Sequence, residues 1–338
     1  MKRGALLLQD PALPGLAEAL EPEAMTPRLA PLATLWEGRK STPGGSWRVA
    51  DIKVLKHKPG RRCALGYMLD GPGGRRCLFA KAFSGERGPG IEEVMREIAA
   101  AIPEEALVVP RPLGYLPDLR LLVTEYVEGT PLATSLHEGK SDVAARRIAS
   151  ALALLHGCAA SLAGRWSASR EVANTGGWLD RSPAGSRVST GRAAALLERL
   201  GRRATLLPEA PEGPVHRDFY AEQVWDCGSR SALLDLDDAR FGDPALDVGN
   251  FVAHLKLRSL QFPRLAPACE RGRPSFLEEY ERQRAGSAGV ESLQERATFY
   301  EAASLLRLSG VYSLRDRWAR FLPEALLDSC EAALDAHG

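Results

Sequence analysis

Three side chains suited to magnesium-nucleotide chemistry lie within one short stretch of the chain, namely Asp218, Gln223 and Asp235. Short apolar runs on both sides of the turn at residues 227–229 are typical of a β-hairpin, whose open ends lie together. Gln223 and Asp235 occupy those ends, and Asp218 lies on the loop that leads in. Magnesium is usually held by one or two carboxylates with phosphates and water. The stretch is therefore interpreted as a phosphoryl-transfer site, where one carboxylate orients a hydroxyl while the other groups bind metal.

The order of the motifs around these residues resembles that of a known family. The run HRD ends at Asp218, an amide follows five residues later, and residues 242–247 read GDPALD. This order resembles the aminoglycoside phosphotransferase and choline kinase branch of the protein-kinase-like superfamily. In that branch H-x-D-x4-N precedes a strand that ends in a metal-binding Asp, and G-D-P-x-x-D follows. Gln223 departs from the pattern, since it keeps the amide oxygen of the usual Asn but adds a methylene group.

The resemblance implies a role for each of these residues. Asp218 would orient or deprotonate the acceptor hydroxyl, and Gln223 and Asp235 would bind Mg²⁺. Asp247 would brace the catalytic loop by hydrogen bonds. Taken singly, carboxylates in a hairpin and a loop face water more often than they take part in catalysis, so the assignment depends on their order.

The segment before this stretch is expected to hold the nucleotide. Over residues 47–83 apolar side chains alternate with a period of two, and two turn-forming breaks predict an antiparallel meander of three strands. Lys81 shares a strand face with large apolar residues, so it needs an anion, and Glu97 on the next helix is the candidate. The resemblance implies that Lys81 and Glu97 fix the nucleotide phosphates. Glu93 is a competing partner, and the alternative is a snorkelling Lys beside a solvated Glu.

Two further segments of this first part could contact the nucleotide. The turn at residues 58–62 falls where the family has its glycine-rich loop, and the backbone of Gly60 and the forked donors of Arg61 could bind phosphates. A basic, solvated hairpin tip is the alternative, because the turn has a single Gly. The later apolar strand that turns polar at its end resembles the kinase hinge, where the main chain of Glu125 and Val127 would pair with adenine. Without the family it is only a buried strand leaving a sheet.

Beyond this strand the apolar spacing becomes helical. His156 resembles a residue of the family's helix before the catalytic loop and is interpreted as structural. Residues 164–205 form the least periodic segment of the second half. Loops on a rigid scaffold commonly carry specificity, so this segment is expected to shape the acceptor pocket, with Trp166 and Trp178 as contacts.

The composition argues against several classes of protein. With 44 basic and 43 acidic residues the formal charge is +1, so no strong field favours nucleic acid or a membrane surface as a partner. The six cysteines are scattered and form no C-x-x-C pair, which argues against a zinc site or a disulfide framework. The first apolar run is too short for a signal peptide, and no run reaches membrane-spanning length. These features predict a cytoplasmic protein.

Together the patterns predict an α+β protein with a two-lobed, protein-kinase-like fold. Residues 1–127 would form an N-lobe with an antiparallel sheet and a helical cap, for nucleotide binding. Residues 128–338 would form a mostly helical C-lobe with the catalytic loop, metal site and acceptor pocket. The function implied is ATP-dependent, Mg²⁺-dependent phosphorylation of a hydroxyl on a small molecule.

A nucleotide-binding regulator without transfer activity, a pseudokinase, is the alternative, because Gln223 and the glycine-poor turn depart from the family. A protein kinase is disfavoured, because no A-P-E-like segment follows Asp235. The acceptor, the choice between ATP and GTP, and the oligomeric state stay open at this point.

Overall fold

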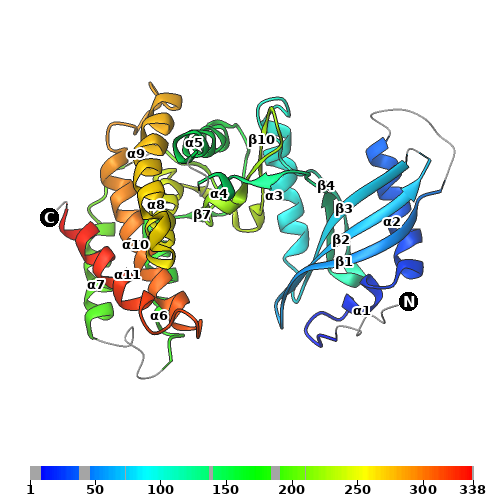
Figure 1. Cartoon of the computed structure of the whole chain (residues 1–338), viewed down its shortest axis with the longest axis horizontal. Helices are drawn as coiled ribbons and strands as arrows, with labels where there is room; N and C mark the ends of the chain where they lie inside the picture. Colours follow the sequence, from blue (N-terminus) through cyan, green and yellow to red (C-terminus); the bar gives the residue numbers. More distant parts are fainter. Residues whose placement is uncertain are drawn as a thin grey trace. The chain divides into compact units, whose positions relative to one another are not determined.

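The chain folds as two compact units (Figure 1). The computed structural model describes residues 9–37, 46–72, 74–136, 140–183, 191–209 and 211–336. The first unit comprises residues 1–99 and 109–128, and the second comprises residues 100–108 and 129–338. Residues 100–108 thus belong to the second unit, although the boundary predicted from the sequence assigned them to the first lobe.

The first unit is built on a five-stranded antiparallel sheet with the order β1-β2-β3-β5-β4. Its strands are β1 (Arg48–Lys58), β2 (Arg62–Gly71), β3 (Gly74–Phe83), β4 (Pro112–Leu116) and β5 (Leu121–Glu125). Its helices are α1 (Leu16–Ala19), α2 (Pro22–Glu37), α3 (Gly88–Ala101) and the short η1 (Pro117–Leu119). Strands β1 to β3 pair in chain order as the predicted meander. The antiparallel sheet is confirmed.

One face of this sheet is buried beneath α1 and α2. Ala80 of β3 and Met25 and Leu29 of α2 are fully buried in the same apolar core. The hydroxyl of Tyr67 in β2 donates a hydrogen bond to the carbonyl of Ala19 at 2.7 Å, which ties the helices to the sheet. Because successive side chains of a strand point to opposite faces, Lys81 lies on the other face of the sheet, where it is half-buried.

The second unit is mostly helical. Its helices are α4 (Leu132–Ser135), α5 (Ser141–Gly157), α6 (Ala168–Leu179), α7 (Gly191–Ala204), α8 (Ala245–Gln261), α9 (Ala266–Gln283), α10 (Leu293–Ser313) and α11 (Leu322–Asp335). Helix α10 packs against α6, α8 and α11 (Figure 1). Gly249 allows the close approach of α8 to α10, because a Cβ atom there would lie 2.4 Å from the Ala297 carbonyl oxygen. Because the two helices lie this close, side chains of α10 can contact side chains of α8.

Two small sheets connect these helices and carry the loops of interest. One contains β6 (Thr130–Pro131), β9 (Val224–Asp226) and β10 (Ser231–Leu233), and the other β7 (Arg165–Trp166), β8 (Gly213–Val215) and β11 (Arg240–Gly242). Short 3₁₀ turns η2 (Ala221–Gln223), η3 (Leu236–Asp238) and η4 (Pro263–Leu265) complete the unit. Strands β9 and β10 form the predicted hairpin, in which Val224 pairs with Leu233. Strand β8 leads into the HRD run and β11 into the GDPALD run.

Two further features of the structure concern membrane-spanning helices and the state of the cysteines. Among the helices of the described ranges, none combines the length and the apolar character that a membrane span requires. All six cysteines are free thiols, and Cys63, Cys269 and Cys330 are buried.

Candidate active site

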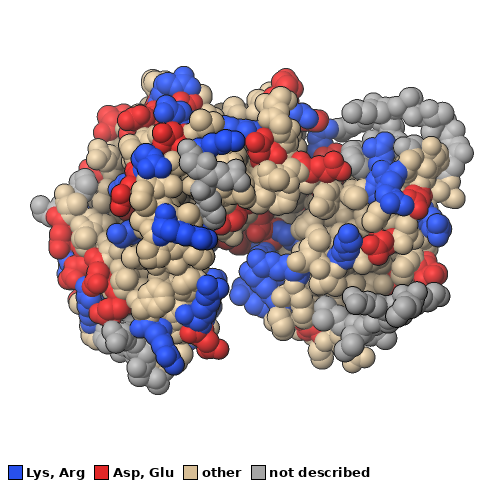
Figure 2. Space-filling view, in the orientation of Figure 1, with Lys and Arg blue, Asp and Glu red and all other residues tan. Residues whose placement is uncertain are grey.

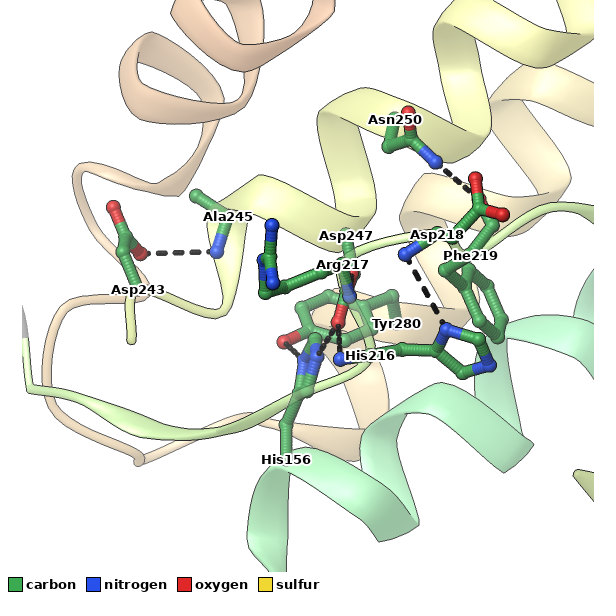
Figure 3. A network of polar contacts seen from close by, with 10 residues as sticks. All are labelled: His156, His216, Arg217, Asp218, Phe219, Asp243, Ala245, Asp247, Asn250 and Tyr280. Carbon is green, nitrogen blue, oxygen red and sulfur yellow. Dashed lines mark hydrogen bonds and ion pairs between the residues drawn. The ribbon is translucent and has the colours of Figure 1, made fainter. Parts of the chain in front are cut away.

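The loop that carries Asp218 is held by a buried carboxylate, Asp247, in the first turn of α8 (Figure 3). Asp247 Oδ2 accepts a hydrogen bond from the backbone N–H of His216 at 2.6 Å, and its Oδ1 accepts one from the backbone N–H of Arg217 at 2.7 Å. Asp247 is fully buried, so water does not compete for these bonds in the folded protein. The predicted bracing role of Asp247 is confirmed.

His156 of α5 holds Asp247 in place. Its Nε2 lies 3.0 Å from Asp247 Oδ2, and its Nδ1 lies 2.7 Å from the hydroxyl of Tyr280 in α9. Burial raises the pKa of the Tyr280 hydroxyl, which therefore keeps its proton. His156 contacts the brace rather than the loop residue Asp218, so its structural role is confirmed.

Arg217, directly before Asp218, adopts a left-handed backbone with a φ of 71°. This conformation is uncommon for a residue with a side chain and turns the loop sharply. The guanidinium carbon of Arg217 lies 3.2 Å from the ring centre of Trp166, and its Nη1 donates to the Asp238 carbonyl at 3.2 Å. Trp166, expected to contact the acceptor, thus packs against the loop that carries Asp218, a contact that no pattern in the sequence predicted. Its role toward an acceptor stays a prediction.

Asp218 itself is half-buried between these supports. Burial raises the pKa of the Asp218 carboxyl above its usual range, and the negative charge of Asp235 raises it further, while the charge of Arg307 opposes both. A carboxylate with a raised pKa is a better proton acceptor at neutral pH. This environment suits a group that takes a proton from a hydroxyl.

Gln223 and Asp235 lie at the open end of the β9–β10 hairpin, as the turn pattern predicted. The Leu234 N–H donates to the Gln223 carbonyl at 2.8 Å, which extends the ladder by one step. Gln223 is buried, and its Nε2 donates to the Asp218 carbonyl at 3.4 Å, which leaves Oε1 as its remaining acceptor. Asp235 follows β10 with a left-handed backbone at a φ of 62°.

These two residues fit Mg²⁺ in the manner of a nucleotide site. Gln223 Oε1 and the Asp235 carboxylate are oxygen donors, which magnesium prefers. Within the part of the chain that the structure describes, no group of three or more His, Cys, Asp or Glu side chains could hold a metal ion alone. A small set of protein ligands suits an ion that keeps water and binds nucleotide phosphates.

Gln223→Ala is expected to raise the Mg²⁺ concentration for half-maximal turnover by about 10-fold, the lower end of losses seen around metal sites. Nucleotide affinity should change less. Gln223→Asn should not improve turnover. The longer Gln side chain reaches the backbone carbonyl of Asp218, and the loop backbone is fitted to that length. A magnesium titration of turnover checks both variants. If Gln223→Ala titrates like the wild type, Gln223 is not a ligand.

Lys81 and Glu97, the pair predicted to hold the nucleotide phosphates, differ in how far they are exposed to solvent. Lys81 is half-buried on β3, with its Nζ 5.9 Å from the ring centre of Phe79. Glu97 is exposed on α3 and makes no ion pair with any residue of the described ranges, and the same holds for Glu93. The pairing of Lys81 with Glu97 stays a prediction.

The turn between β1 and β2 is tied to the N-terminal segment by Asp10. Asp10 Oδ2 accepts a hydrogen bond from the Gly60 N–H at 2.9 Å and lies 2.8 Å from His57 Nε2. Gly60 has a φ of 71°, which favours glycine, and Arg61 is exposed beside it. A carboxylate thus already occupies a backbone donor of this turn. Phosphate binding by Gly60 and Arg61 stays a prediction.

Asp10→Asn is expected to lower the melting temperature of the protein by a few degrees at neutral pH. The Gly60 N–H bond, then the His57 contact, lower the pKa of Asp10, so its stabilising effect is present above the ordinary Asp pKa and is lost as the pH falls through the depressed value. Thermal unfolding from pH 7 to pH 3 should therefore show the two proteins converge in acid. Asp51→Asn, at an exposed position of β1, is the control. A gap that is constant with pH would contradict this account.

The proposed hinge residues end the sheet of the first unit. The Glu125 N–H donates to the Arg111 carbonyl at 3.0 Å, and the Glu125 carbonyl accepts from the Thr124 hydroxyl at 3.1 Å. Val127, two residues later, is half-buried. Contact of Glu125 and Val127 with adenine stays a prediction.

Comparison with known proteins identifies the family. The model of the phosphotransferase enzyme family, APH, matches residues 69–296, which include the Asp218 loop, the hairpin and Asp247. The chain belongs to this family. No curated protein sequence matches it. The match begins within β2, so the helices α1 and α2 lie outside it.

Solved structures of an aminoglycoside phosphotransferase and of choline kinases share the fold. A thermostable mutant of aminoglycoside phosphotransferase APH(4)-Ia, in complex with AMP-PNP and hygromycin B, is 18% identical with a TM-score of 0.57, over 90% of this chain and 98% of that chain. A choline/ethanolamine kinase family protein from Mesorhizobium loti is 18% identical with a TM-score of 0.56, over 84% and 88%. Choline kinase LicA from Streptococcus pneumoniae is 14% identical with a TM-score of 0.53, over 85% and 94%. The predicted protein-kinase-like fold is confirmed.

Proposed function

We propose that this APH-family protein transfers the terminal phosphate of ATP to a hydroxyl of a small molecule. One observation carries the proposal. The buried Asp247 carboxylate holds the backbone on the N-terminal side of Asp218, and Gln223 donates to the Asp218 carbonyl from the open end of the β9–β10 hairpin, where Asp235 also lies. A purely structural acidic loop would not need this support.

Each site residue of the second unit has its own task in this proposal. The acceptor hydroxyl donates its hydrogen bond to Asp218, which orients it and takes its proton as the oxygen bonds to the terminal phosphorus of ATP and the bond from that phosphorus to ADP breaks. Gln223 and Asp235 would hold Mg²⁺, which neutralises phosphate charge when bound. Asp247 and His156 keep the loop fixed, so the carboxylate does not have to reorganise during the reaction.

The first unit supplies the nucleotide contacts in the same proposal. The Lys81 ammonium would bind the phosphates, assisted by Glu97, and Gly60 with Arg61 would cover them. The Glu125 carbonyl and the Val127 N–H would pair with adenine. Support comes from relatives of the same fold, since APH(4)-Ia forms ternary complexes with hygromycin B and either AMP-PNP or ADP.

The acceptor is proposed to be a soluble metabolite or an antibiotic in the cytoplasm. The relatives named above act on aminoglycosides or choline, which supports a small alcohol as the acceptor class. The near-neutral formal charge of +1 gives nucleic acid no electrostatic advantage as a partner.

The test is ADP release by the purified protein with Mg²⁺-ATP and pooled metabolites and aminoglycosides, with mass spectrometry of any product. A product heavier by one phosphate supports the proposal. ATP affinity without transfer to any pool favours the regulator alternative, in which the protein binds nucleotide but does not turn it over. No ATP binding by calorimetry rejects both.

A further inference from the structure

A half-buried arginine of α10, Arg307, reaches toward the loop that carries Asp218. Arg307 Nη2 donates a hydrogen bond to Asn250 Oδ1 at 2.7 Å, and Asn250 Nδ2 donates to the carbonyl of Phe219 at 2.9 Å. Figure 3 shows the second of these bonds, beside Asp218. The Asn250 side chain is buried, and the Arg307 side chain is only 12% exposed. The three groups form a short relay from α10 through α8 to the residue directly after Asp218.

The chemistry of arginine fixes the direction of this relay. The two ends of the Asn250 amide have nearly the same shape, but only its nitrogen can donate to the Phe219 carbonyl. Arginine has donors but no acceptor, so only the amide oxygen can face Arg307. The amide nitrogen must then face Phe219, where it donates to the carbonyl. An inverted amide would set its oxygen against the Phe219 carbonyl and its nitrogen against the guanidinium, so both partners select the same orientation.

Glu171 of α6 forms an ion pair with Arg307. Its Oε1 lies 3.5 Å from Arg307 Nε, and its Oε2 accepts from Trp166 Nε1 at 2.9 Å. Trp166 in turn packs under the guanidinium of Arg217. One connected network therefore contacts the residue before Asp218 and the residue after it. Of these two residues, Asp247 binds Arg217, before Asp218, but not Phe219, after it.

We propose that Arg307 is a positioning residue for phosphoryl transfer, which acts through Asn250 to fix the backbone on the C-terminal side of Asp218. The inference rests on the proposed function for its kinetic consequence. Arg307 does not have to touch the acceptor or the nucleotide for this role. Its loss should misplace the Asp218 carboxylate relative to the hydroxyl that it orients.

The kinetic test compares Arg307→Met with Arg273→Met. Arg273 is the matched control, because it also pairs with a glutamate, Glu301 of α10, with both Nη atoms at 2.9 Å from the carboxylate, but does not contact the loop. Arg307→Met should lower kcat by about 100-fold, the scale of a small misplacement of a reacting group. The KM values for ATP and acceptor should stay within about 3-fold, since binding is not the step affected. Arg273→Met should keep kcat.

Two further variants separate positioning from folding. Arg307→Lys should retain part of the activity, because lysine can still donate to Asn250 Oδ1, and guanidinium ion should restore activity to Arg307→Ala. Asn250→Ala and Arg307→Met should be non-additive, with the double variant about as slow as the slower single variant. Independent, multiplying effects in the double variant would overturn the relay. Equal kcat losses in Arg307→Met and Arg273→Met would also overturn it.

Hydrogen–deuterium exchange tests the relay without any turnover. Peptides covering residues 216–223 should exchange faster in Arg307→Met than in the wild type, while Arg273→Met should leave them unchanged. If the wild type transfers no phosphate but this difference is found, the proposed function fails and the relay stands. If exchange of the loop is unchanged in Arg307→Met, the relay fails, whatever the activity. Should Arg307→Met not fold, Asn250→Ala gives the same comparison, because it removes the donor to the Phe219 carbonyl at the other end of the relay.

Discussion

Asp218→Asn is expected to lower kcat by about 10²–10⁴-fold, the contribution of a general base. The variant keeps the size of the side chain but removes its charge and its ability to accept a proton. The loop should keep its shape, because Asp247 binds the backbone of His216 and Arg217 rather than the side chain of Asp218. ATP affinity should therefore change little. Steady-state ADP release and calorimetric ATP binding on the same preparation check this.

Asp226→Asn provides the control for this experiment. Asp226 lies in β9 of the same hairpin and pairs with Arg147 at 2.8 Å, so its loss perturbs the hairpin but not the loop. We expect its turnover to stay close to that of the wild type. If Asp218→Asn turned over normally, Asp218 would not be the base. If both variants lost activity equally, the cause would be hairpin folding.

Asp235→Asn is expected to be the most damaging change at the metal site, with the Mg²⁺ requirement raised by more than about 100-fold. Loss of a group that only supports a metal ligand costs about 10–100-fold in affinity, and a carboxylate that faces a divalent cation contributes more than a neutral amide. Asparagine tolerates the left-handed backbone at this position, so the fold should be kept. Magnesium titrations of turnover for this variant and the Gln223 variants test the ranking.

The same Asp226→Asn protein serves as the control for the titration, because it keeps the charge at residue 235. A magnesium requirement unchanged in Asp235→Asn would rule out the carboxylate as a ligand. A loss of ATP binding in the absence of magnesium would point to a role of Asp235 in the nucleotide site itself.

The second unit's loop and hairpin could be predicted from the sequence because their signals are local. Asp218, Gln223 and Asp235 are separated by a turn, and a short hairpin leaves few ways to arrange its ends. Asp247 could be assigned because the family motif fixes its spacing from the loop. Asn250 offered a similar signal that was missed, since it lies three residues after Asp247 on one face of α8.

The contacts that could not be predicted join residues far apart in the chain. Arg307 and Glu171 meet only after α6 and α10 have packed together, and arginine is common enough on helices to give no signal. Asp10 reaches Gly60 from a segment that the family pattern does not include. Glu97 was placed by its helical spacing, which fixes a face of α3 but not the partner that the face meets. Periodicity predicts elements, whereas such pairs depend on how the elements pack.

The left-handed backbone of Asp235 has a consequence for attempts to engineer this protein. A residue with a side chain in that conformation costs roughly 1 kcal/mol relative to glycine, somewhat less for Asp. Glycine at residue 235 would therefore relieve the backbone while removing the carboxylate. A screen that scores heat resistance alone would collect such proteins as improvements, although they had lost the carboxylate that we propose binds Mg²⁺. A screen for thermal stability that varies residue 235 should therefore also measure enzyme activity.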